Sequence, residues 1–203
     1  KKEKLKLWLD KNDVRYADNF FKNINKRLLI GFHPGGSNTL ESMLSKRWPT
    51  ENFSKLADLL IKRYNARVLV FLGPDEEDLE PNFTKNKSVQ IIKGLSINKI
   101  AALISKCNYF ISNDSGLMHI ATALDVPVLA IFGSTDPNRT RPWGRHVSVQ
   151  TKLKCAPCAH TIKNLEKKFK CIYKNPKCMK SISVKEVLNG FGKLVKKYPK
   201  KRH

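Results

Sequence analysis

The 203-residue chain carries 39 Lys and Arg residues against 17 Asp and Glu residues, a formal net charge of +22, and 41% of its residues are hydrophobic. This is enough apolar material for one substantial core, with or without a small appendage, and no run of 18 apolar residues predicts a membrane-spanning helix. The charge favours anionic partners such as nucleotides, phospholipid head groups or nucleic acid, and it is equally consistent with a well-solvated surface.

Residues 1–26 combine apolar and charged side chains ahead of the first clear strand. The segment is too apolar for a flexible linker, so we expect a connector with a short helix that packs on the main domain. The chain begins with Lys1 rather than methionine, and we interpret it as a piece of a longer protein whose N-terminal domain is absent.

Residues 27–150 alternate continuous apolar runs with amphipathic stretches, which is the pattern of strands followed by helices. Apolar runs without polar alternation are typical of parallel strands that are buried on both faces. We therefore predict an α/β fold, a Rossmann-like doubly wound parallel sheet. The expected strands are 28–33, 68–72, 89–92, 109–113 and 128–132, and the expected helices are 50–64, 97–104 and 116–124.

The turn Asp114–Gly116 lies where the fourth expected strand meets the next helix. Ser115 is a suitable N-cap, and Gly116 lets a ligand approach the backbone, where the free amides of a helix start favour a phosphate. Asp114 occupies the carboxyl end of the strand, and His119 returns to the same side one helical turn later. A helix histidine with no chemical role is the plain alternative for His119, and its place beside Asp114 and Ser115 favours a functional one.

Further polar turns would lie along the same edge of a parallel sheet, the edge at which open α/β sheets bind ligands. A lysine or arginine there could reach a diphosphate, and a carboxylate could accept hydrogen bonds from ribose hydroxyls. Taken singly, these segments are equally a simple turn, a solvated base or a helix cap; together they predict a site for a nucleotide with two phosphates. They are the small residues 35–39, the bases Lys46 and Arg47, the acidic residues 75–77, and the turn 133–137.

The tail from residue 151 carries four of the five cysteines at the spacing C-x2-C-x12-C-x6-C: Cys155, Cys158, Cys171 and Cys178. This spacing allows a structural zinc site, although its longer gaps differ from those of a standard zinc finger. Reduced thiols, disulfides and redox chemistry are the alternatives that the sequence leaves open. The fifth cysteine, Cys107, is expected to pack as a small hydrophobe. A helix from Ser183 follows, with Glu186 completing a capping box.

Several motifs resemble those of a known family: KRWP at 46–49, NDSGLMHIATAL at 113–124 and IFGSTDP at 131–137. With the acidic turn after FLG at 71–73, the CAPC start of the tail and the CM-x-x-I segment at 178–182, they resemble the donor-binding half of the family 9 glycosyltransferases, the ADP-heptose:lipopolysaccharide heptosyltransferases. The resemblance covers about residues 28–190.

The resemblance implies a GT-B enzyme, in which two Rossmann-like domains face a cleft. Residues 27–150 would be the C-terminal, nucleotide-sugar-binding domain, and residues 151–203 would pack on it or run back from it. The donor substrate would be ADP-heptose, and no cofactor would be required. The resemblance assigns site residues by role: Lys46 to the donor diphosphate, Asp114 to the sugar hydroxyls, Ser115, Gly116 and His119 to the phosphates, Ser37 and Asn38 to the phosphate loop, Asp75 or Glu76 to the ribose, and the backbone near Leu95 to the adenine.

The family reaction is inverting: an acceptor hydroxyl attacks the anomeric carbon as ADP leaves. Lys46 and His119 would stabilise the leaving diphosphate without a metal. The resemblance implies that the base for the acceptor hydroxyl is an Asp of the N-terminal domain. We therefore expect the 203 residues to bind the donor without turning it over.

The partners that the resemblance implies are a nucleotide-sugar donor, a lipopolysaccharide core acceptor reached through the N-terminal domain, and an anionic membrane surface. They place the protein in the cytoplasm at the inner face of the inner membrane, in bacterial outer-membrane biogenesis, with no nucleic acid as partner. Two alternatives from other classes are a non-catalytic nucleotide-sugar-binding module and a basic, zinc-containing nucleic-acid-binding domain.

Overall fold

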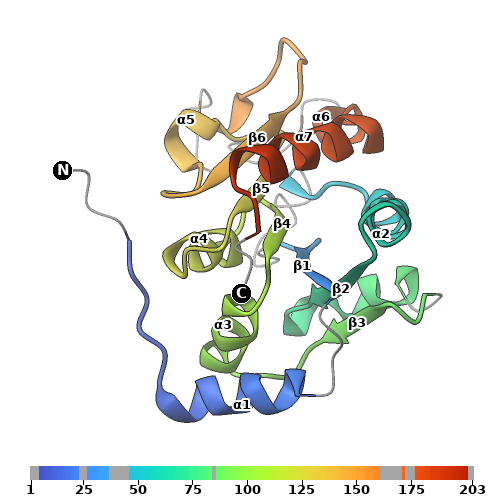
Figure 1. The fold of residues 1–203 in the computed structure, drawn as a ribbon. Helices are drawn as coiled ribbons and strands as arrows, with labels where there is room; N and C mark the ends of the chain where they lie inside the picture. The colour runs from blue at the N-terminus through green and yellow to red at the C-terminus, as the bar shows by residue number, and fades with distance from the viewer. Residues whose placement is uncertain are drawn as a thin grey trace.

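The computed structural model describes residues 5–22, 27–36, 46–83, 86–160, 171 and 177–200. Its centre is a sheet of six parallel strands in the order β3-β2-β1-β4-β5-β6 (Figure 1). The predicted α/β, Rossmann-like doubly wound sheet is confirmed. The strands are β1 (Leu28–His33), β2 (Ala66–Phe71), β3 (Val89–Ile92), β4 (Tyr109–Asn113), β5 (Val128–Phe132) and β6 (His146–Gln150).

Helices cover both faces of the sheet and give each face its own apolar core. On one face α2 and α7 pack on the strands, and on the other face α3 and α4 do so, with α1 lying against α3 (Figure 1). The helices are α1 (Lys11–Phe21), α2 (Thr50–Tyr64), α3 (Ile97–Ser105), α4 (Gly116–Ala123), α5 (Pro137–Thr140), α6 (Lys177–Lys180) and α7 (Val184–Lys197), with 3-10 segments at Pro74–Asn82 and Cys158–His160.

The five expected strands are present within two residues of their predicted bounds, and the sixth strand, β6, was not predicted. β6 is an edge strand that pairs with β5 alone, so its residues are half-buried or exposed rather than fully enclosed. Val147 and Val149 pack on the core beneath α7, while Ser148 between them is exposed. A short strand with one apolar side carries a weaker sequence signal than a fully buried one.

Serine side chains cap α3 and α7, and the capping box predicted at Ser183 and Glu186 is confirmed. Ser96 accepts a hydrogen bond from the amide of Lys99 at 3.5 Å, at the start of α3. At the start of α7, Ser183 Oγ accepts from the amide of Glu186 at 3.2 Å, and Glu186 accepts in return from the amide of Ser183 at 2.9 Å. This reciprocal capping box defines where α7 begins.

Trp48 anchors the segment that precedes α2. Its ring is fully buried, lies edge-on to Phe53 with 5.0 Å between ring centroids, and donates from Nε1 to the carbonyl of Ile182 at 2.8 Å. Because Trp48 is held in this way, the two basic residues before it are placed at the carboxyl edge of the sheet. None of the described helices is long and apolar enough to span a lipid bilayer.

Candidate functional site

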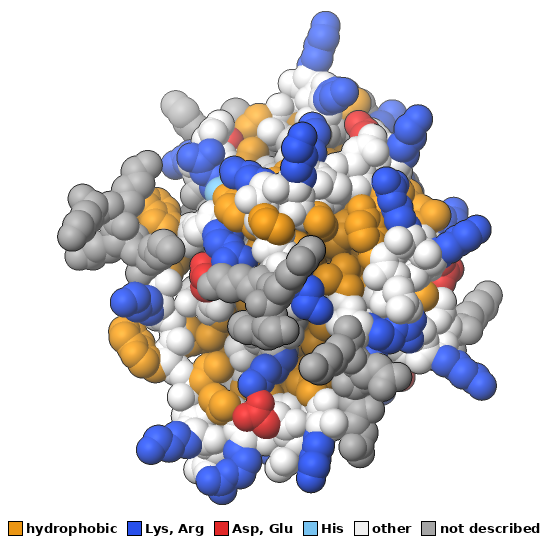
Figure 2. All heavy atoms as spheres, viewed as in Figure 1, with side chains coloured by type: hydrophobic (Ala, Val, Ile, Leu, Met, Phe, Trp, Pro, Cys, Tyr) orange, Lys and Arg blue, Asp and Glu red, His pale blue; other side chains and the backbone are white. Residues whose placement is uncertain are grey.

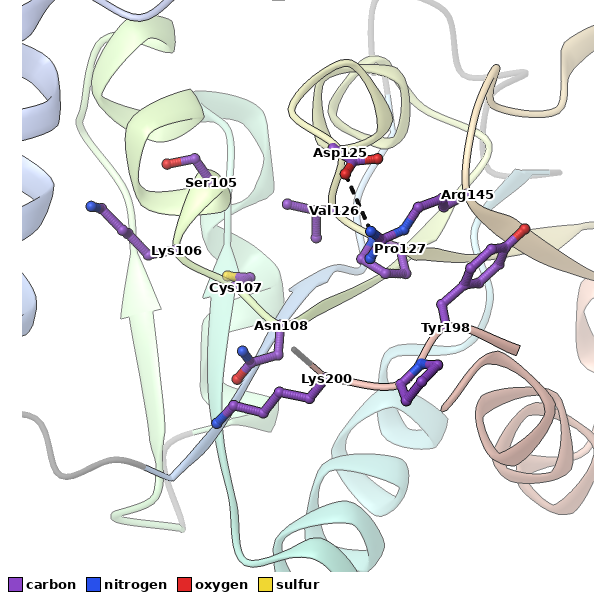
Figure 3. A pocket seen from close by; sticks show the side chains of 11 residues that line it. Ser105, Lys106, Cys107, Asn108, Asp125, Val126, Pro127, Arg145, Tyr198 and Lys200 are labelled. Carbon is purple, nitrogen blue, oxygen red and sulfur yellow. Dashed lines mark hydrogen bonds and ion pairs between the residues drawn. The ribbon is translucent and has the colours of Figure 1, made fainter. Parts of the chain in front are cut away.

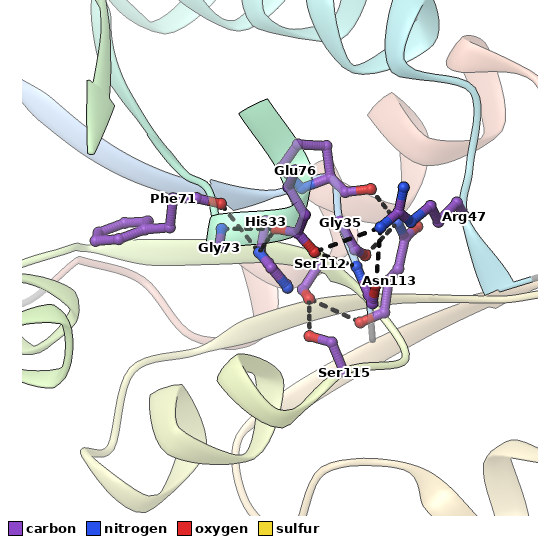
Figure 4. Close-up of polar contacts among 11 residues, drawn as sticks. His33, Gly35, Arg47, Phe71, Gly73, Glu76, Ser112, Asn113 and Ser115 are labelled. Carbon is purple, nitrogen blue, oxygen red and sulfur yellow. Dashed lines mark hydrogen bonds and ion pairs between the residues drawn. The ribbon is translucent and has the colours of Figure 1, made fainter. Parts of the chain in front are cut away.

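The candidate site lies at the carboxyl ends of β1 and β4, where the strand order of the sheet reverses direction. Asn113, the last residue of β4, is fully buried and bridges the two sides of this crevice. Its Nδ2 donates to the carbonyls of Pro34 and Gly35, at 2.7 and 3.1 Å (Figure 4). Its Oδ1 accepts from the amide of Trp48 at 3.1 Å. The end of β1 and the start of α2 are thereby tied to β4.

Lys46 and Asp114 form an ion pair at the centre of the site. The Lys46 Nζ lies 3.2 Å from the Asp114 Oδ2, and the side chains are only 18% and 7% exposed. The two residues belong to segments that are far apart in the sequence. Their short distance is consistent with the prediction that both segments meet at this edge of the sheet. The ammonium group can attract phosphate oxygens, and the carboxylate can accept hydrogen bonds from hydroxyls.

The start of α4 follows directly from Asp114. Ser115 occupies the N-cap position with an extended backbone, as predicted, but its side chain makes no capping bond. Instead the Ser115 Oγ lies 3.0 Å from the Ser112 Oγ, so no serine oxygen covers the first amides of the helix. A Cβ placed on Gly116 would meet no atom within 4 Å, and His119 is half-buried one turn further on. Among the residues that the structure describes, the helix start is therefore open to an external acceptor.

Glu76 is buried, and backbone amides engage both oxygens of its carboxylate. Oε1 accepts from the amide of Gly36 and Oε2 from the amide of Gly73, both at 2.8 Å (Figure 4). Arg47 lies 3.7 Å from Oε1 and donates to the carbonyl of Gly36 at 2.9 Å. Asp75 is exposed on the same turn. The assignment of Asp75 or Glu76 to the ribose stays a prediction, and the sequence did not anticipate that Glu76 connects two loops.

Other predicted site residues are less closely defined. Leu95 is half-buried and packs against the core on the α3 and α4 face. Ser37 and Asn38, assigned to the phosphate loop, lie outside the described residues, as does Thr39.

His33, at the end of β1, was missed by the sequence analysis. It is 7% exposed, and its Nδ1 lies 3.0 Å from the carbonyl oxygen of Phe71 and 3.8 Å from Glu76 Oε2. Burial lowers the pKa of His33, the carboxylate of Glu76 opposes this shift, and the nearby Arg47 adds to it. We conclude that His33 is neutral at pH 7. The signal that could have found it is its position as the polar last residue of an otherwise apolar strand.

The four tail cysteines lie near the turn that follows β5 and form no disulfide. A Cβ on Gly133 would lie 3.1 Å from the Cys178 sulfur, and burial raises the pKa of the Cys178 thiol to about 11. The thiols of Cys155, Cys158 and Cys171 are close enough to contribute to that rise. Among the described residues, however, no group of three or more His, Cys, Asp or Glu side chains is arranged to hold a metal ion. Cys107 is buried in the core, as predicted.

A cavity of about 340 Å³ opens at the opposite, amino edge of the sheet (Figure 3). Its lining includes Asn108, Pro127, Tyr198 and Arg145, and Arg145 pairs with Asp125 at 3.2 Å. The carboxyl ends of α3, α4 and α7 lead into the lining segments, and helix carboxyl ends carry partial negative charge. The lining also contains the bases Lys106 and Lys200, so positive charge alone does not separate the two regions. Open α/β sheets bind ligands at the carboxyl edge of the strands, so the Lys46–Asp114 edge remains the candidate site.

A known protein family matches most of this chain. The model of glycosyltransferase family 9 (heptosyltransferase) matches residues 1–169. The chain belongs to this family. A lipooligosaccharide heptosyltransferase 2 of Campylobacter jejuni is 32% identical over 185 residues, which is 84% of this chain and 52% of that protein. A lipopolysaccharide heptosyltransferase 2 of Escherichia coli is 30% identical over 67% of this chain and 40% of its own length. This family 9 chain therefore spans about half or less of these relatives.

Solved structures show the same fold. The ADP-heptose lipopolysaccharide heptosyltransferase II of E. coli superposes with a TM-score of 0.72 at 23% identity, over 95% of this chain and 54% of that one. A family 9 glycosyltransferase from Veillonella parvula gives a TM-score of 0.75 at 24% identity, over 95% and 54%. A dodecameric, iron-containing heptosyltransferase solved with ADP-D-β-D-heptose gives 0.64 at 17% identity, over 86% and 47%.

Proposed function

We propose that this chain is the donor-binding part of an inverting heptosyltransferase that transfers heptose from ADP-heptose to the inner core of lipopolysaccharide. The observation that carries the proposal is the Lys46–Asp114 pair, held at the strand-order reversal beside the open start of α4. It is supported by membership of family 9 and by neighbours solved with ADP and with ADP-heptose.

The residues divide the chemistry of donor binding and departure. Lys46 and the first amides of α4 supply positive charge to the diphosphate, which gains negative charge as the glycosidic bond breaks. Asp114 accepts hydrogen bonds from sugar hydroxyls and orients the anomeric carbon. The acceptor hydroxyl forms the new bond to that carbon from the opposite side, and its proton passes to a base. We assign that base to an N-terminal acceptor domain, so residues 27–150 bind the donor without turnover.

Calorimetric titration with ADP, UDP and ADP-heptose tests the donor site directly. We expect ADP to bind more tightly than UDP, and Lys46→Ala to weaken ADP binding by about tenfold or more, since it removes a charge-assisted contact. Asp114→Ala should weaken ADP-heptose by a similar factor, since it removes the acceptor for the sugar hydroxyls. Lys55→Ala, an exposed lysine of α2, is the matched control and should leave the affinity unchanged. Equal affinities in all four proteins would contradict the proposal.

Two alternatives make different predictions in the same experiment. A non-catalytic nucleotide-sugar module would bind ADP-heptose in the same way and would show no transfer when joined to an acceptor domain of the family. A nucleic-acid-binding domain would bind a short DNA duplex in a salt-dependent manner and would bind no nucleotide.

We also propose a peripheral contact with an anionic membrane leaflet on the cytoplasmic side. The segment between α5 and β6 contains Trp143, which is 59% exposed, and the exposed Arg141, and α5 ends near the exposed Arg139. Tryptophan favours the membrane–water interface, and arginine is attracted to anionic lipid.

A structural zinc at Cys155, Cys158, Cys171 and Cys178 stays a prediction. The mutual proximity of the four thiols supports it, whereas no described group has the arrangement of a metal site. Elemental analysis of protein purified without chelator decides between zinc and reduced thiols.

A further inference from the structure

We propose that Glu76 and Asn113 are positioning residues that hold the chain on both sides of Lys46 and so place its ammonium group against Asp114. The proposal rests on the proposed donor-binding function and assigns to Glu76 a role other than ribose binding. Neither side chain needs to touch the donor for this role.

Glu76 holds the chain that leaves β1. Its carboxylate accepts the amides of Gly36 and Gly73, at 2.8 Å each, and thereby joins the turn after β1 to the turn after β2. A Cβ on Gly35 would lie 1.9 Å from Glu76 Oε1, so the backbone of this turn rests directly on the carboxylate. The contact requires a residue without a side chain at position 35.

Arg47 also binds the backbone of Gly36. While Glu76 accepts the Gly36 amide, the Arg47 guanidinium donates to the Gly36 carbonyl at 2.9 Å and lies 3.7 Å from Glu76 Oε1 (Figure 4). Both polar groups of Gly36 are therefore engaged, one by the residue that follows Lys46. The side chains of Arg47 and Glu76 are only 11% and 7% exposed, so water competes weakly for these contacts.

Asn113 holds the same region from the other side. Its amide group donates to Pro34 and Gly35 and accepts from the Trp48 amide, two residues after Lys46. Asn113 also immediately precedes Asp114, so one buried side chain links the backbone that carries the carboxylate to the backbone that carries the ammonium group. Asn113 through Trp48, and Glu76 through Arg47, thus hold the two residues that follow Lys46, whose Nζ lies 3.2 Å from the Asp114 Oδ2.

The direct role of Glu76 as a ribose ligand and the positioning role give different results with a ligand that has no ribose. Glu76→Gln keeps the size of the side chain but turns an acceptor oxygen into an NH2 group that faces a backbone amide. If Glu76 acts through Lys46, the affinities for ADP and for inorganic pyrophosphate should both fall by about tenfold. A fall for ADP alone would overturn the proposal in favour of ribose binding.

A second measurement does not depend on nucleotide binding. Amide hydrogen exchange in the unliganded wild-type protein should show Gly36 and Gly73 protected, and Glu76→Gln should speed exchange at one or both by about tenfold or more while the amides of β1 and β4 keep their rates. Rapid exchange of both glycines in the wild type would overturn the clamp. If neither ADP nor pyrophosphate bound the wild type, the proposed function would fail, whereas this measurement would still decide the clamp.

Asn113→Asp is the independent variant, because it retains the acceptor for the Trp48 amide and loses the donors to Pro34 and Gly35. We expect it to weaken ADP and pyrophosphate to similar extents. Asp78→Asn, an exposed acidic residue near Glu76, is the charge-matched control and should change neither affinity nor exchange. Wild-type affinity for both ligands in Glu76→Gln and Asn113→Asp would overturn the proposal.

Discussion

In the proposed donor site, the largely buried Lys46–Asp114 pair would serve binding rather than stability. Removing two charges from water costs free energy that their mutual attraction returns only in part, so such a pair is weak evidence for a stabilising role. The pair instead keeps an ammonium group and a carboxylate partly desolvated and in place before a ligand arrives. A diphosphate that meets Lys46 then meets a group with little hydration left to lose.

His33 gives a pH-dependent test at the level of one residue. Burial lowers its pKa in the folded protein below the value of 6.5 expected when unfolded, so between these two values the unfolded chain binds a proton that the folded chain does not. Stability should therefore fall as the pH drops through about 6.5, by at most roughly 1.4 kcal/mol per pH unit. Urea unfolding between pH 5 and 8 measures the slope.

The matched variant for this test is His33→Asn, which keeps a polar side chain without the titrating ring. The variant should be less stable than the wild type at pH 8, because the asparagine side chain is smaller and does not reproduce the contact of the imidazole with the Phe71 carbonyl. This difference in stability should shrink toward pH 5. A constant difference in stability across this range would show that protonation of His33 does not cause the pH dependence.

At the scale of one element, α7 shows how close packing on the sheet depends on a single position. Its capping box defines its start, and its apolar side covers β5 and β6. Gly190 is the point of closest approach: a Cβ there would lie 2.7 Å from Val149 and 3.0 Å from Leu129. Gly192, in the same helix, has no atom within 4 Å of an added Cβ.

Alanine substitution at these two glycines should have opposite effects. Gly192→Ala should stabilise the protein by about 0.5–1 kcal/mol, because alanine loses less backbone entropy in a helix. Gly190→Ala gains the same term but must displace buried side chains, which costs about 1–3 kcal/mol, so the net effect should be destabilising. Chemical denaturation of both variants measures the difference, and equal effects would contradict the packing shown here.

On the scale of the whole molecule, the net charge of +22 comes from basic residues that are spread along the chain rather than confined to one tract. Figure 2 shows blue Lys and Arg side chains around the visible face, with few red acidic ones between them. A diffuse positive field of this kind draws anions toward the molecule without defining where they bind. Under the proposed function, Lys46 and its neighbours would therefore supply the specificity for a diphosphate.

The membrane proposal is tested with vesicles and intrinsic fluorescence. Of the three tryptophans, Trp48 is buried while Trp8 and Trp143 are 82% and 59% exposed. We expect binding to phosphatidylglycerol vesicles, weak binding to phosphatidylcholine, and a blue shift of emission that persists in Trp8→Phe and disappears in Trp143→Phe. Arg139→Glu with Arg141→Glu should abolish sedimentation with the anionic vesicles, and unchanged sedimentation would remove this surface from consideration.

The sequence by itself determined the fold class and the edge of the sheet on which Lys46 and Asp114 lie. Uninterrupted apolar runs indicated buried parallel strands, and helix-start residues after β4 indicated a site for phosphate, because both signals are local in the chain. The capping box of α7 was readable for the same reason. Family membership also followed from short motifs with fixed spacing.

Only the tertiary structure decided which side chains hold the site together. Glu76 bonds a residue 40 positions away and Asn113 one 65 positions away, and no local pattern encodes such pairings. The Ser115 hydroxyl forms a hydrogen bond with the Ser112 hydroxyl instead of capping α4, because the neighbouring hydroxyl competes with the helix amides. Periodicity reports which residues are buried, whereas the partners of a buried polar group depend on how distant segments meet.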